Sequence, residues 1–246
     1  MGVIAIIPAR LNSTRLPRKV LLNETGKPLI AHVVETVLQS DRLDRVVVAA
    51  DSQEIVDALN RFDVEVVLTD PDHPNGTSRL AQAARLLDLS DEDIIVNIQG
   101  DEPEMDPLLI DGAVDAFVKS GVEMGTLGSL MQAGDGPNDP NLVKVVTRLG
   151  ADGVHRAVYF SRSLIPFDRD NADPQYLKHA GLYVYQRAFL DRFANWPISK
   201  LESIEQLEQL RAIEAGVEIS VAIMPFVHKG IDTPSDYRAF VARQSQ

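Results

Sequence analysis

Long apolar runs alternate with amphipathic segments over the first 120 residues of the chain. Four runs rich in β-branched residues are almost continuously apolar, at residues 3–7, 46–50, 64–68 and 94–98. Apolar positions at helical spacing mark the segments between and after these runs, at residues 28–40, 52–61, 77–88 and 106–119. A strand that is apolar on both faces is typical of a parallel sheet covered by helices on both sides. The pattern therefore predicts an α/β fold with a doubly wound, mostly parallel sheet.

Beyond residue 120 the pattern changes to short strands separated by Gly, Pro, Asn and Asp turns. These strands are expected in "VEMGTLGSLM", "LVKVVTRL", "GVHRAVYFSR" and "GLYVY". No linker sets this part off, so we expect a single domain over residues 1–246, with a smaller antiparallel β extension at about residues 121–200. An apolar stripe along residues 201–214 predicts one helix. Residues 217–224 are predicted as a last strand, and Thr233-Pro234 as the start of a final helix.

Polar residues follow each of the first four predicted strands. In a doubly wound sheet, ligands bind in the crevice outside the carboxyl ends of the strands. Arg10 follows the first strand, Asp51 the second, Asp70 the third and Gln99-Gly100-Asp101 the fourth. The sequence therefore predicts that a basic loop and an acidic residue meet at one edge of the sheet.

The basic loop is the stretch "IIPARLNSTRLPRK" at residues 6–19. It carries Arg10, Arg15, Arg18 and Lys19 without an acid, in a chain whose formal net charge is −12. Arginine forks and a lysine held in a proline-anchored loop suit a polyphosphate. The sequence has neither the P-loop pattern nor the dinucleotide glycine fingerprint, so it is not a dinucleotide-dependent dehydrogenase. The alternative is a solvated loop whose cations pair with nearby acids.

Asp101 and Asp232 are the candidate metal ligands. Mg²⁺ typically takes one or two carboxylates together with substrate phosphates. Asp232 lies just outside the predicted helix cap and is free to ligate, whereas Gly100-Asp101 with Pro103 is equally well read as a plain turn. The Asn75-Gly76 turn starts a helix whose free amides would face the ligand edge. Arg79, in the first turn of that helix, opposes the helix dipole and hints at an anionic partner or a nearby acid.

Composition narrows the class of partner. The chain is acidic, with a sequence pI near 4.8, and has no cysteine. This composition argues against a nucleic acid or a membrane surface as the main partner and excludes thiolate chemistry. The first apolar run is too short for a signal peptide or a membrane span, so we expect a cytoplasmic protein.

Several motifs together resemble the 3-deoxy-manno-octulosonate cytidylyltransferase (CMP-Kdo synthetase) family. They occur in one order from residue 3 to about 238: "IPARLNSTRLPRK", "GTSRL", "NIQGDEP", "YFSRSLIPFDRD", "HAGLYVY", "LEQLR" and "GIDTP". The resemblance implies a nucleotide-diphospho-sugar transferase-like fold. It also implies transfer of CMP from CTP to the anomeric hydroxyl of Kdo, with Mg²⁺ as cofactor, giving CMP-Kdo and pyrophosphate for lipopolysaccharide biosynthesis.

The resemblance also implies roles for individual residues. The implied nucleotide contacts are Arg10, Ser13, Arg15, Lys19, Asn75, Gly76, Arg79 and Asp101. The implied catalytic residues are Lys19, Arg10, Asp101 and Asp232, of which the two aspartates would also hold the metal. The implied sugar-acid contacts are Gln99, Arg162, Arg169, His179, Tyr183, Glu208 and Gln209.

Without the resemblance, these sugar-acid residues have plainer explanations. Arg162 and Arg169 would pair with nearby aspartates, and His179 would be a structural histidine. Tyr183 would be packed in its strand. Glu208-Gln209 would lie on the solvent side of a helix.

The chain departs from the family pattern at five positions, one of which is Val20 in place of a proline. Arg18 replaces a glycine, so the loop is expected to be strained or to change its path if that glycine has a positive φ. Asn75 and Ser78 replace the serine and glutamate of the nucleotide motif, and Gln186 replaces an arginine. The alternatives are another sugar-acid cytidylyltransferase, of the acylneuraminate or 8-amino-Kdo type, or a non-catalytic nucleotide-binding regulatory protein. Alternation of Val and Tyr in the middle strands suits a two-fold contact, so we expect a homodimer.

Overall fold

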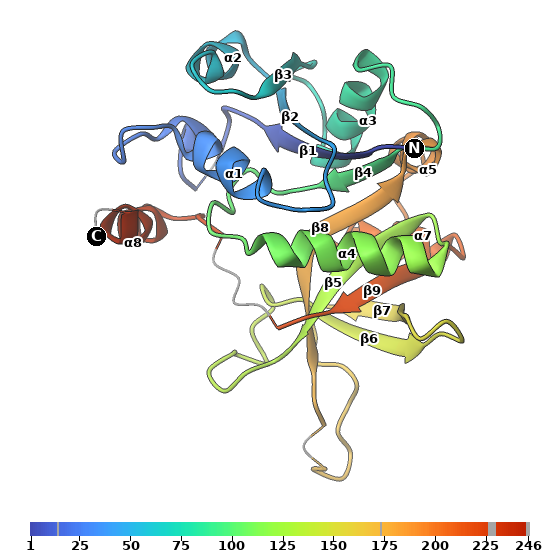
Figure 1. The fold of residues 1–246 in the computed structure, drawn as a ribbon. Helices are drawn as coiled ribbons and strands as arrows, with labels where there is room; N and C mark the ends of the chain where they lie inside the picture. The colour runs from blue at the N-terminus through green and yellow to red at the C-terminus, as the bar shows by residue number, and fades with distance from the viewer. Residues whose placement is uncertain (14, 173, 226–229, 245–246) are drawn as a thin grey trace.

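One nine-stranded sheet runs through the molecule. The computed structural model describes residues 1–13, 15–172, 174–225 and 230–244. The strand order is β3-β2-β1-β4-β8-β5-β9-β7-β6, with a further pairing between β8 and β6. Figure 1 shows this sheet as the middle layer, with α1 and α4 in front of it.

The first half of the chain forms the parallel part of the sheet, as the pattern predicts. Strands β1 to β4 pair in parallel, with β1 between β2 and β4. The elements of this half are β1 (Val3–Ala9), the short 3-10 helix η1 (Lys19–Leu21), α1 (Leu29–Val37), β2 (Arg45–Ala50), α2 (Gln53–Leu59), β3 (Glu65–Leu68), α3 (Gly76–Leu86), β4 (Ile94–Asn97) and α4 (Pro107–Ser120).

The second half continues the same sheet in mixed directions. Strand β8 pairs antiparallel with both β4 and β5, whereas β9 pairs in parallel with β5. The elements here are β5 (Met124–Leu130), β6 (Lys144–Leu149), β7 (His155–Ser161), β8 (Leu177–Gln186), α5 (Arg187–Ala194), α6 (Lys200–Glu205), α7 (Gln209–Glu214), β9 (Ile219–Ile223) and α8 (Pro234–Gln244). The β-rich segment thus joins the parallel half through β8 within one sheet.

Each face of the sheet has its own apolar core. On one face, Ile30 of α1, Ile55 of α2 and Ile110 of α4 pack against alternate strand residues. On the other, Leu80 of α3 and Phe189 of α5 pack with residues of α7. Because alternate residues of a strand point to opposite faces, strands buried on both faces must be apolar throughout. Strands β1 and β4 and most of β2 show that pattern, whereas β3, at the edge of the sheet, begins and ends with exposed residues.

Residues 201–214 do not form the single predicted helix. A capping box of Ser199 and Glu202 starts α6, which ends at Gln206 with a left-handed φ of 54°. Helix α7 then begins at Gln209. The carbonyls of Glu205 and Gln206 accept hydrogen bonds from the Arg162 guanidinium. The Arg162 side chain therefore occupies two backbone carbonyls that, in a continuous helix, would accept hydrogen bonds from amides one turn later.

Helix α5 was not predicted. Its buried Phe189, Leu190 and Phe193 recur at helical spacing, which was the available signal. The rings of Phe189 and Phe193 stack against the ring of Tyr185 of β8, and the centroids of the two phenylalanine rings are 5.5 Å apart.

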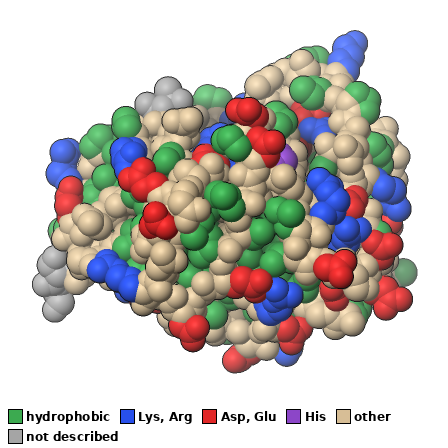
Figure 2. Space-filling view, turned by 90° about the horizontal axis from the view of Figure 1, so that it is seen from above, with side chains coloured by type: hydrophobic (Ala, Val, Ile, Leu, Met, Phe, Trp, Pro, Cys, Tyr) green, Lys and Arg blue, Asp and Glu red, His purple; other side chains and the backbone are tan. Residues whose placement is uncertain are grey.

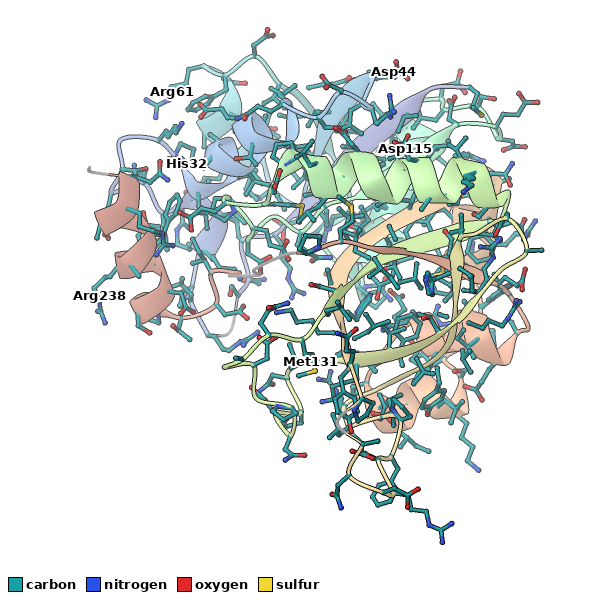
Figure 3. All side chains as sticks on the ribbon, turned by 60° about the horizontal axis from the view of Figure 1, so that its bottom comes forward. His32, Asp44, Arg61, Asp115, Met131 and Arg238 are labelled. Atoms are coloured by element: carbon teal, nitrogen blue, oxygen red, sulfur yellow. The ribbon has the colours of Figure 1, made fainter. Side chains whose placement is uncertain are left out.

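The C-terminal segment packs against the basic loop through a third, small core. Leu16 of the loop and Leu29 of α1 meet Ile231, Tyr237 and Phe240 there. His32 of α1 also packs edge-on against the ring of Phe240, and Figure 3 shows His32 beside α8. This core therefore brings the two ends of the sequence together.

The surface mixes both signs of charge. Figure 2, seen from above, shows acidic and basic side chains interspersed among apolar ones on that face. In the part of the chain that the structure describes, no helix combines the length and the apolarity that a membrane crossing requires.

Candidate active site

A cavity of about 330 Å³ opens at the carboxyl ends of β1 and β4. It is bounded by the end of β1, the basic loop, the β3–α3 turn and the segment after β4. Its lining includes eight predicted site residues, namely Arg10, Ser13, Lys19, Asn75, Gly76, Arg79, Gln99 and Asp101. Apolar Pro8 and Val20 also line it and were not predicted. The expectation that the basic loop and the acid after the fourth strand meet at one edge is therefore confirmed.

Gly100 allows the close approach of two strand ends at this cavity. A Cβ atom at residue 100 would lie 2.9 Å from the carbonyl oxygen of Pro8, closer than a side chain tolerates. The glycine of the "QGDEP" motif is thus explained by packing of backbone against backbone.

Lys19 joins the two predicted metal-ligand aspartates. Its ammonium group is 2.6 Å from Asp101 Oδ2 and 3.2 Å from Asp232 Oδ1, and its side chain is about 10% exposed. Arg15 makes a second ion pair with Asp232, at 3.1 Å. The backbone amide of Ile231 donates to the carbonyl of Asp101, which holds the C-terminal segment in register with the turn after β4.

These two carboxylates have the chemistry of a site for a hard cation. Their side chains are 29% and 40% exposed, so Asp101 and Asp232 remain accessible from solvent. Among the described residues no group of three or more His, Cys, Asp or Glu side chains converges on one point. Two carboxylates fit Mg²⁺ if phosphate oxygens complete its coordination.

The basic loop turns sharply at Arg18, which has a φ of 56° and a ψ of 28°. This left-handed conformation is the one expected for the family glycine, so the loop has the strain that the sequence predicted at this position. The Arg18 guanidinium pairs with Glu54 of α2, and the backbone amide of Leu11 donates to the Asp51 carboxylate.

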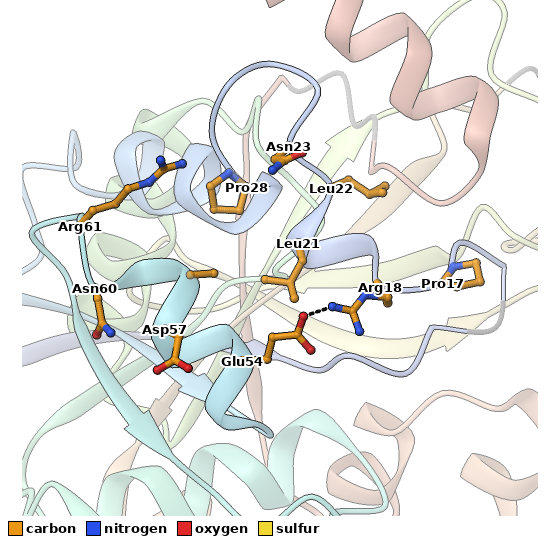
Figure 4. Close-up of a pocket in the computed structure, with 11 residues that line it drawn as sticks. Pro17, Arg18, Leu21, Leu22, Asn23, Pro28, Glu54, Asp57, Asn60 and Arg61 are labelled. Atoms are coloured by element: carbon orange, nitrogen blue, oxygen red, sulfur yellow. Dashed lines mark hydrogen bonds and ion pairs between the residues drawn. The ribbon is translucent and has the colours of Figure 1, made fainter.

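Arg18 faces away from the first cavity. It borders a second cavity of about 630 Å³ between η1, the start of α1 and α2. Figure 4 shows Arg18, Glu54, Asp57 and Arg61 around it. Consecutive residues of the loop therefore serve different surfaces, Arg18 the second cavity and Lys19 the first.

Asn75 caps the N-terminus of α3 at the first cavity. Its Oδ1 atom accepts a hydrogen bond from the Ser78 amide, and its Nδ2 atom donates to Glu208 Oε1 at 3.0 Å. Asn75 and Ser78 thus form an intact cap despite departing from the family motif. His73 contacts Ser78 Oγ at 3.0 Å and Gln82 Oε1 at 2.6 Å, which fixes the preceding turn.

Arg79 is buried behind this cap. Its guanidinium donates to Thr69 Oγ1 at 2.6 Å and to the backbone carbonyl of Asp70 at 3.0 Å. Burial lowers the pKa of the Arg79 guanidinium from its ordinary value, and Asp51 acts in the opposite direction. The position of Arg79 in the first turn suggested an anionic partner. Its hydrogen-bond partners within the protein are instead mainly neutral oxygens of the β3–α3 segment.

Glu102 is buried beside the two aspartates. The backbone at Gly100-Asp101 forms a turn, with the Glu102 amide 3.4 Å from the Gln99 carbonyl, rather than an extended segment. The Glu102 side chain is 7% exposed. Burial, together with the negative charges of Asp101 and Asp232, raises the pKa of Glu102 to about 8. Glu102 therefore favours its neutral form near neutral pH.

Three of the predicted sugar-acid residues gather where β8 bulges. Thr126 of β5 is paired with Tyr183, and the next residue of β5 is paired with Ala180. The bulge brings the rings of His179 and Tyr183 to 5.4 Å, and His179 Nε2 lies 2.9 Å from Thr126 Oγ1. Gln99 Nε2 donates to the carbonyl of Gly181 inside the bulge. Burial raises the pKa of the Tyr183 hydroxyl well above its ordinary value.

The two predicted arginines of this group lie elsewhere. The Arg162 guanidinium is bonded to backbone carbonyls rather than to aspartates. Arg169 is exposed in the loop between β7 and β8, which projects from the sheet at the bottom of Figure 1. Neither arginine is among the residues that line the 330 Å³ cavity.

Glu208-Gln209 is not solvent-exposed as its helix position alone would suggest. Glu208 bonds to the α3 cap, and burial raises the pKa of its carboxyl group. Gln209 is 3% exposed. Within the described residues, its Nε2 atom and Asn97 Oδ1 are buried without a hydrogen-bond partner. Asn97 of β4 is paired with Tyr183 of β8 and was not predicted as a site residue.

Comparisons with known proteins agree with this geometry. A cytidylyltransferase family model matches residues 4–219. The 3-deoxy-manno-octulosonate cytidylyltransferase of Syntrophobacter fumaroxidans is 46% identical, over 98% of this chain and 96% of its own length. The chain belongs to the 3-deoxy-manno-octulosonate cytidylyltransferase family. It is therefore a cytidylyltransferase.

Relatives within this family differ in the sugar named in their description. The 8-amino-3,8-dideoxy-manno-octulosonate cytidylyltransferase of Shewanella pealeana is 42% identical, over 99% of this chain and 98% of its own length. A solved structure of CMP:2-keto-3-deoxy-manno-octonic acid synthetase complexed with CTP superposes with a TM-score of 0.91 at 35% identity. It covers 100% of this chain and 99% of that one. The nucleotide-diphospho-sugar transferase-like fold expected from the resemblance is thereby confirmed.

Proposed function

We propose that this cytidylyltransferase transfers CMP from CTP to the anomeric hydroxyl of Kdo or of its 8-amino analogue, for lipopolysaccharide biosynthesis. The observation that carries this proposal is Lys19 held between Asp101 and Asp232 at the edge of a cavity lined by Arg10. A cationic loop, a helix N-terminus and a carboxylate pair on one cavity suit a triphosphate and a hard cation.

The reaction needs positioning and charge neutralisation. The sugar hydroxyl oxygen forms a bond to the α-phosphorus while the bond from that phosphorus to the bridging oxygen breaks, and pyrophosphate leaves. Arg10 and Lys19 would donate to phosphate oxygens and stabilise the charge that builds up on the leaving group. Ser13, Arg15 and the capped start of α3 would hold the rest of the nucleotide.

Asp101 and Asp232 would hold Mg²⁺. When bound, the metal would neutralise phosphate charge and favour the ionised form of the attacking hydroxyl. Lys19 keeps the two carboxylates close together by bonding to both. The aspartates therefore need little rearrangement to act as a pair.

The sugar acid would lie toward the bulge of β8. His179, Tyr183 and Gln99 are grouped there, and Gln209 has a buried, unbonded amide nitrogen within the described residues. A substrate hydroxyl or carboxylate would supply the missing acceptor for that nitrogen. The choice between a hydroxyl and an amine at one sugar carbon would then rest on a few such contacts.

We also propose a cytoplasmic homodimer. The support for a dimer is the exposed apolar side chains at the β6–β7 end of the sheet, Leu149 at 65% and Val158 at 48% exposure. Light scattering coupled to size exclusion tests this state directly.

Pyrophosphate release tests the activity. The purified protein is incubated with Mg²⁺, CTP and either Kdo, its 8-amino analogue or no sugar, with ATP, GTP and UTP in parallel and a chelator control. Release that requires CTP, metal and one of the two sugars supports the proposal and identifies the substrate. Nucleotide binding without release in any combination contradicts it.

A further inference from the structure

The carboxylate pair of Asp101 and Asp232, which fits a hard cation, holds a cation of the protein between its two side chains. The Lys19 ammonium group lies 2.6 Å from Asp101 Oδ2 and 3.2 Å from Asp232 Oδ1. Asp232 Oδ1 also pairs with Arg15 Nη2 at 3.1 Å. Carboxylate oxygens that would ligate a metal are therefore engaged by positively charged side chains.

The two cations differ in how freely they can leave. The Arg15 side chain is 69% exposed, whereas that of Lys19 is about 10% exposed. The backbone of Lys19 is held in η1, where Val20 packs into the core and the Leu22 amide donates to the Lys19 carbonyl at 3.2 Å. Lys19 also lines the 330 Å³ cavity. Its ammonium group is therefore confined between the carboxylates and the cavity, and rotation of the side chain moves it from one to the other.

A metal ion and this ammonium group cannot share the carboxylates without strong repulsion. Mg²⁺ lies about 2.1 Å from its oxygen ligands, so a metal ion on Asp101 Oδ2 would be within about 5 Å of the Lys19 ammonium nitrogen. Charges of the same sign at that distance in a partly buried site destabilise each other. A triphosphate in the cavity offers the ammonium group other negatively charged oxygens. Nucleotide binding would therefore free the carboxylates for the metal.

We propose that Lys19 competes with the divalent cation for Asp101 and Asp232, so that metal binding at this pair depends on a triphosphate that draws the ammonium group away. The inference rests on the proposed function, because the cavity must accept a triphosphate. It gives Lys19 a role before the reaction, in addition to its contacts with phosphate oxygens. A lysine that only holds the two carboxylates together would have the opposite effect, since it would promote metal binding.

Mn²⁺ binding to the protein alone tests the competition, because Mn²⁺ takes the same oxygen ligands as Mg²⁺. Electron paramagnetic resonance measures the free Mn²⁺ during the titration. Lys19→Met should bind Mn²⁺ at least about tenfold more tightly than wild type, because the competing charge is gone. Lys19→Gln should do the same, and Lys19→Arg, which keeps the charge, should stay within about twofold of wild type.

Two controls assign the effect to this site. The gain in affinity should disappear in Lys19→Met/Asp101→Asn, which removes one carboxylate of the pair. Lys27→Met is the matched control for the loss of a lysine charge, because Lys27 pairs with Glu35 of α1, and it should leave Mn²⁺ binding unchanged. Far-UV circular dichroism and thermal unfolding establish that each variant is folded, and Lys19→Gln carries the test if Lys19→Met does not fold.

Water-proton relaxation measures the dependence on nucleotide. It distinguishes Mn²⁺ on the slowly tumbling protein from free Mn²⁺ and from the small Mn²⁺–CTP complex. The enhancement with wild type should be small until CTP is added, whereas Lys19→Met should show it without CTP.

Unchanged or weaker Mn²⁺ binding in the folded neutral variants overturns the inference. A wild-type enhancement that is already complete without CTP does so as well. Wild-type protein that fails to bind CTP in calorimetry with Mg²⁺ overturns the proposed function itself. The two failures are distinguishable, because the comparison of Lys19→Met with wild type uses neither nucleotide nor sugar.

Discussion

Glu102 gives a prediction whose size follows from the structure. Its carboxyl is buried beside Asp101 and Asp232, and the pKa in the folded protein is about 8 against an ordinary value of 4.5. Between those two values the unfolded chain has released this proton while the folded chain still holds it. Stability must therefore fall as the pH rises through this window, by about 1.4 kcal/mol per pH unit from this group.

Glu102→Gln removes the titration while keeping the shape of a neutral carboxyl group. Below pH 4.5 the variant and the wild type should differ little in the free energy of unfolding. Between pH 5.5 and 7.5 the stability of the variant relative to wild type should grow by about 3 kcal/mol. The gain should level off above pH 8, where the wild-type carboxyl ionises in the folded state as well.

Urea unfolding curves at several pH values, followed by fluorescence of the single tryptophan and by circular dichroism, measure this difference. The buffers contain a chelator, because a cation on the neighbouring aspartates would favour the ionised carboxylate. Glu92→Gln, at an exposed carboxylate in the turn before β4, corrects for the loss of one negative charge. Stability profiles of wild type and Glu102→Gln that stay parallel from pH 5.5 to 7.5 would refute the reasoning.

Three further predictions concern the loop, the carboxylate pair and the C-terminal core. Asp101→Asn should reduce turnover below detection with an unchanged circular dichroism spectrum; near-normal turnover at saturating Mg²⁺ would contradict this. Arg18→Gly and Arg18→Ala both lose the pair with Glu54, but only glycine relieves the strain of the left-handed φ. The glycine variant should therefore be more stable to urea than the alanine variant by about 1 kcal/mol. Equal stabilities would show that the turn is unstrained. Phe240→Ala removes a ring that is 1% exposed and should lower the free energy of unfolding by about 3–5 kcal/mol. If α8 detaches locally, turnover should fall at temperatures where the rest of the protein stays folded. Full activity up to the global unfolding temperature would mean that α8 does not hold Asp232 in place.

The local pattern predicted the elements that depend on local chemistry. Continuous apolar runs specify strands buried on both faces, and the Asn75 turn and Asp106 both cap helices as such residues do elsewhere. The rule that ligands bind at the carboxyl ends of parallel strands was enough to bring Arg10, Gln99 and Asp101 to one cavity. The resemblance, which implies a glycine at position 18, led to the conditional prediction of a strained or altered loop, and Arg18 has a φ of 56°.

Local pattern failed where a distant group competed for a local acceptor. Residues 201–214 have the stripe of one helix, yet the Arg162 fork takes the carbonyls of Glu205 and Gln206 and the helix breaks there. The family resemblance implied that Arg162 contacts the sugar acid, and the plainer explanation was a pair with a nearby aspartate. The actual partners of the Arg162 guanidinium are three backbone carbonyl oxygens from two other segments, Pro140 and the Glu205-Gln206 turn, and no spacing in the sequence encodes these contacts.

The sequence by itself determined the order of the strands and helices in the first half of the chain, the cationic loop after the first strand and the acid after the fourth. Only the tertiary structure decided that Asp232 would lie beside Lys19, 213 positions earlier in the chain. The apolar contacts of Ile231, Tyr237 and Phe240 with Leu16 and Leu29 bring the two ends together. Such contacts form between faces that the whole fold must first create, so the carboxylate pair exists only in the folded protein.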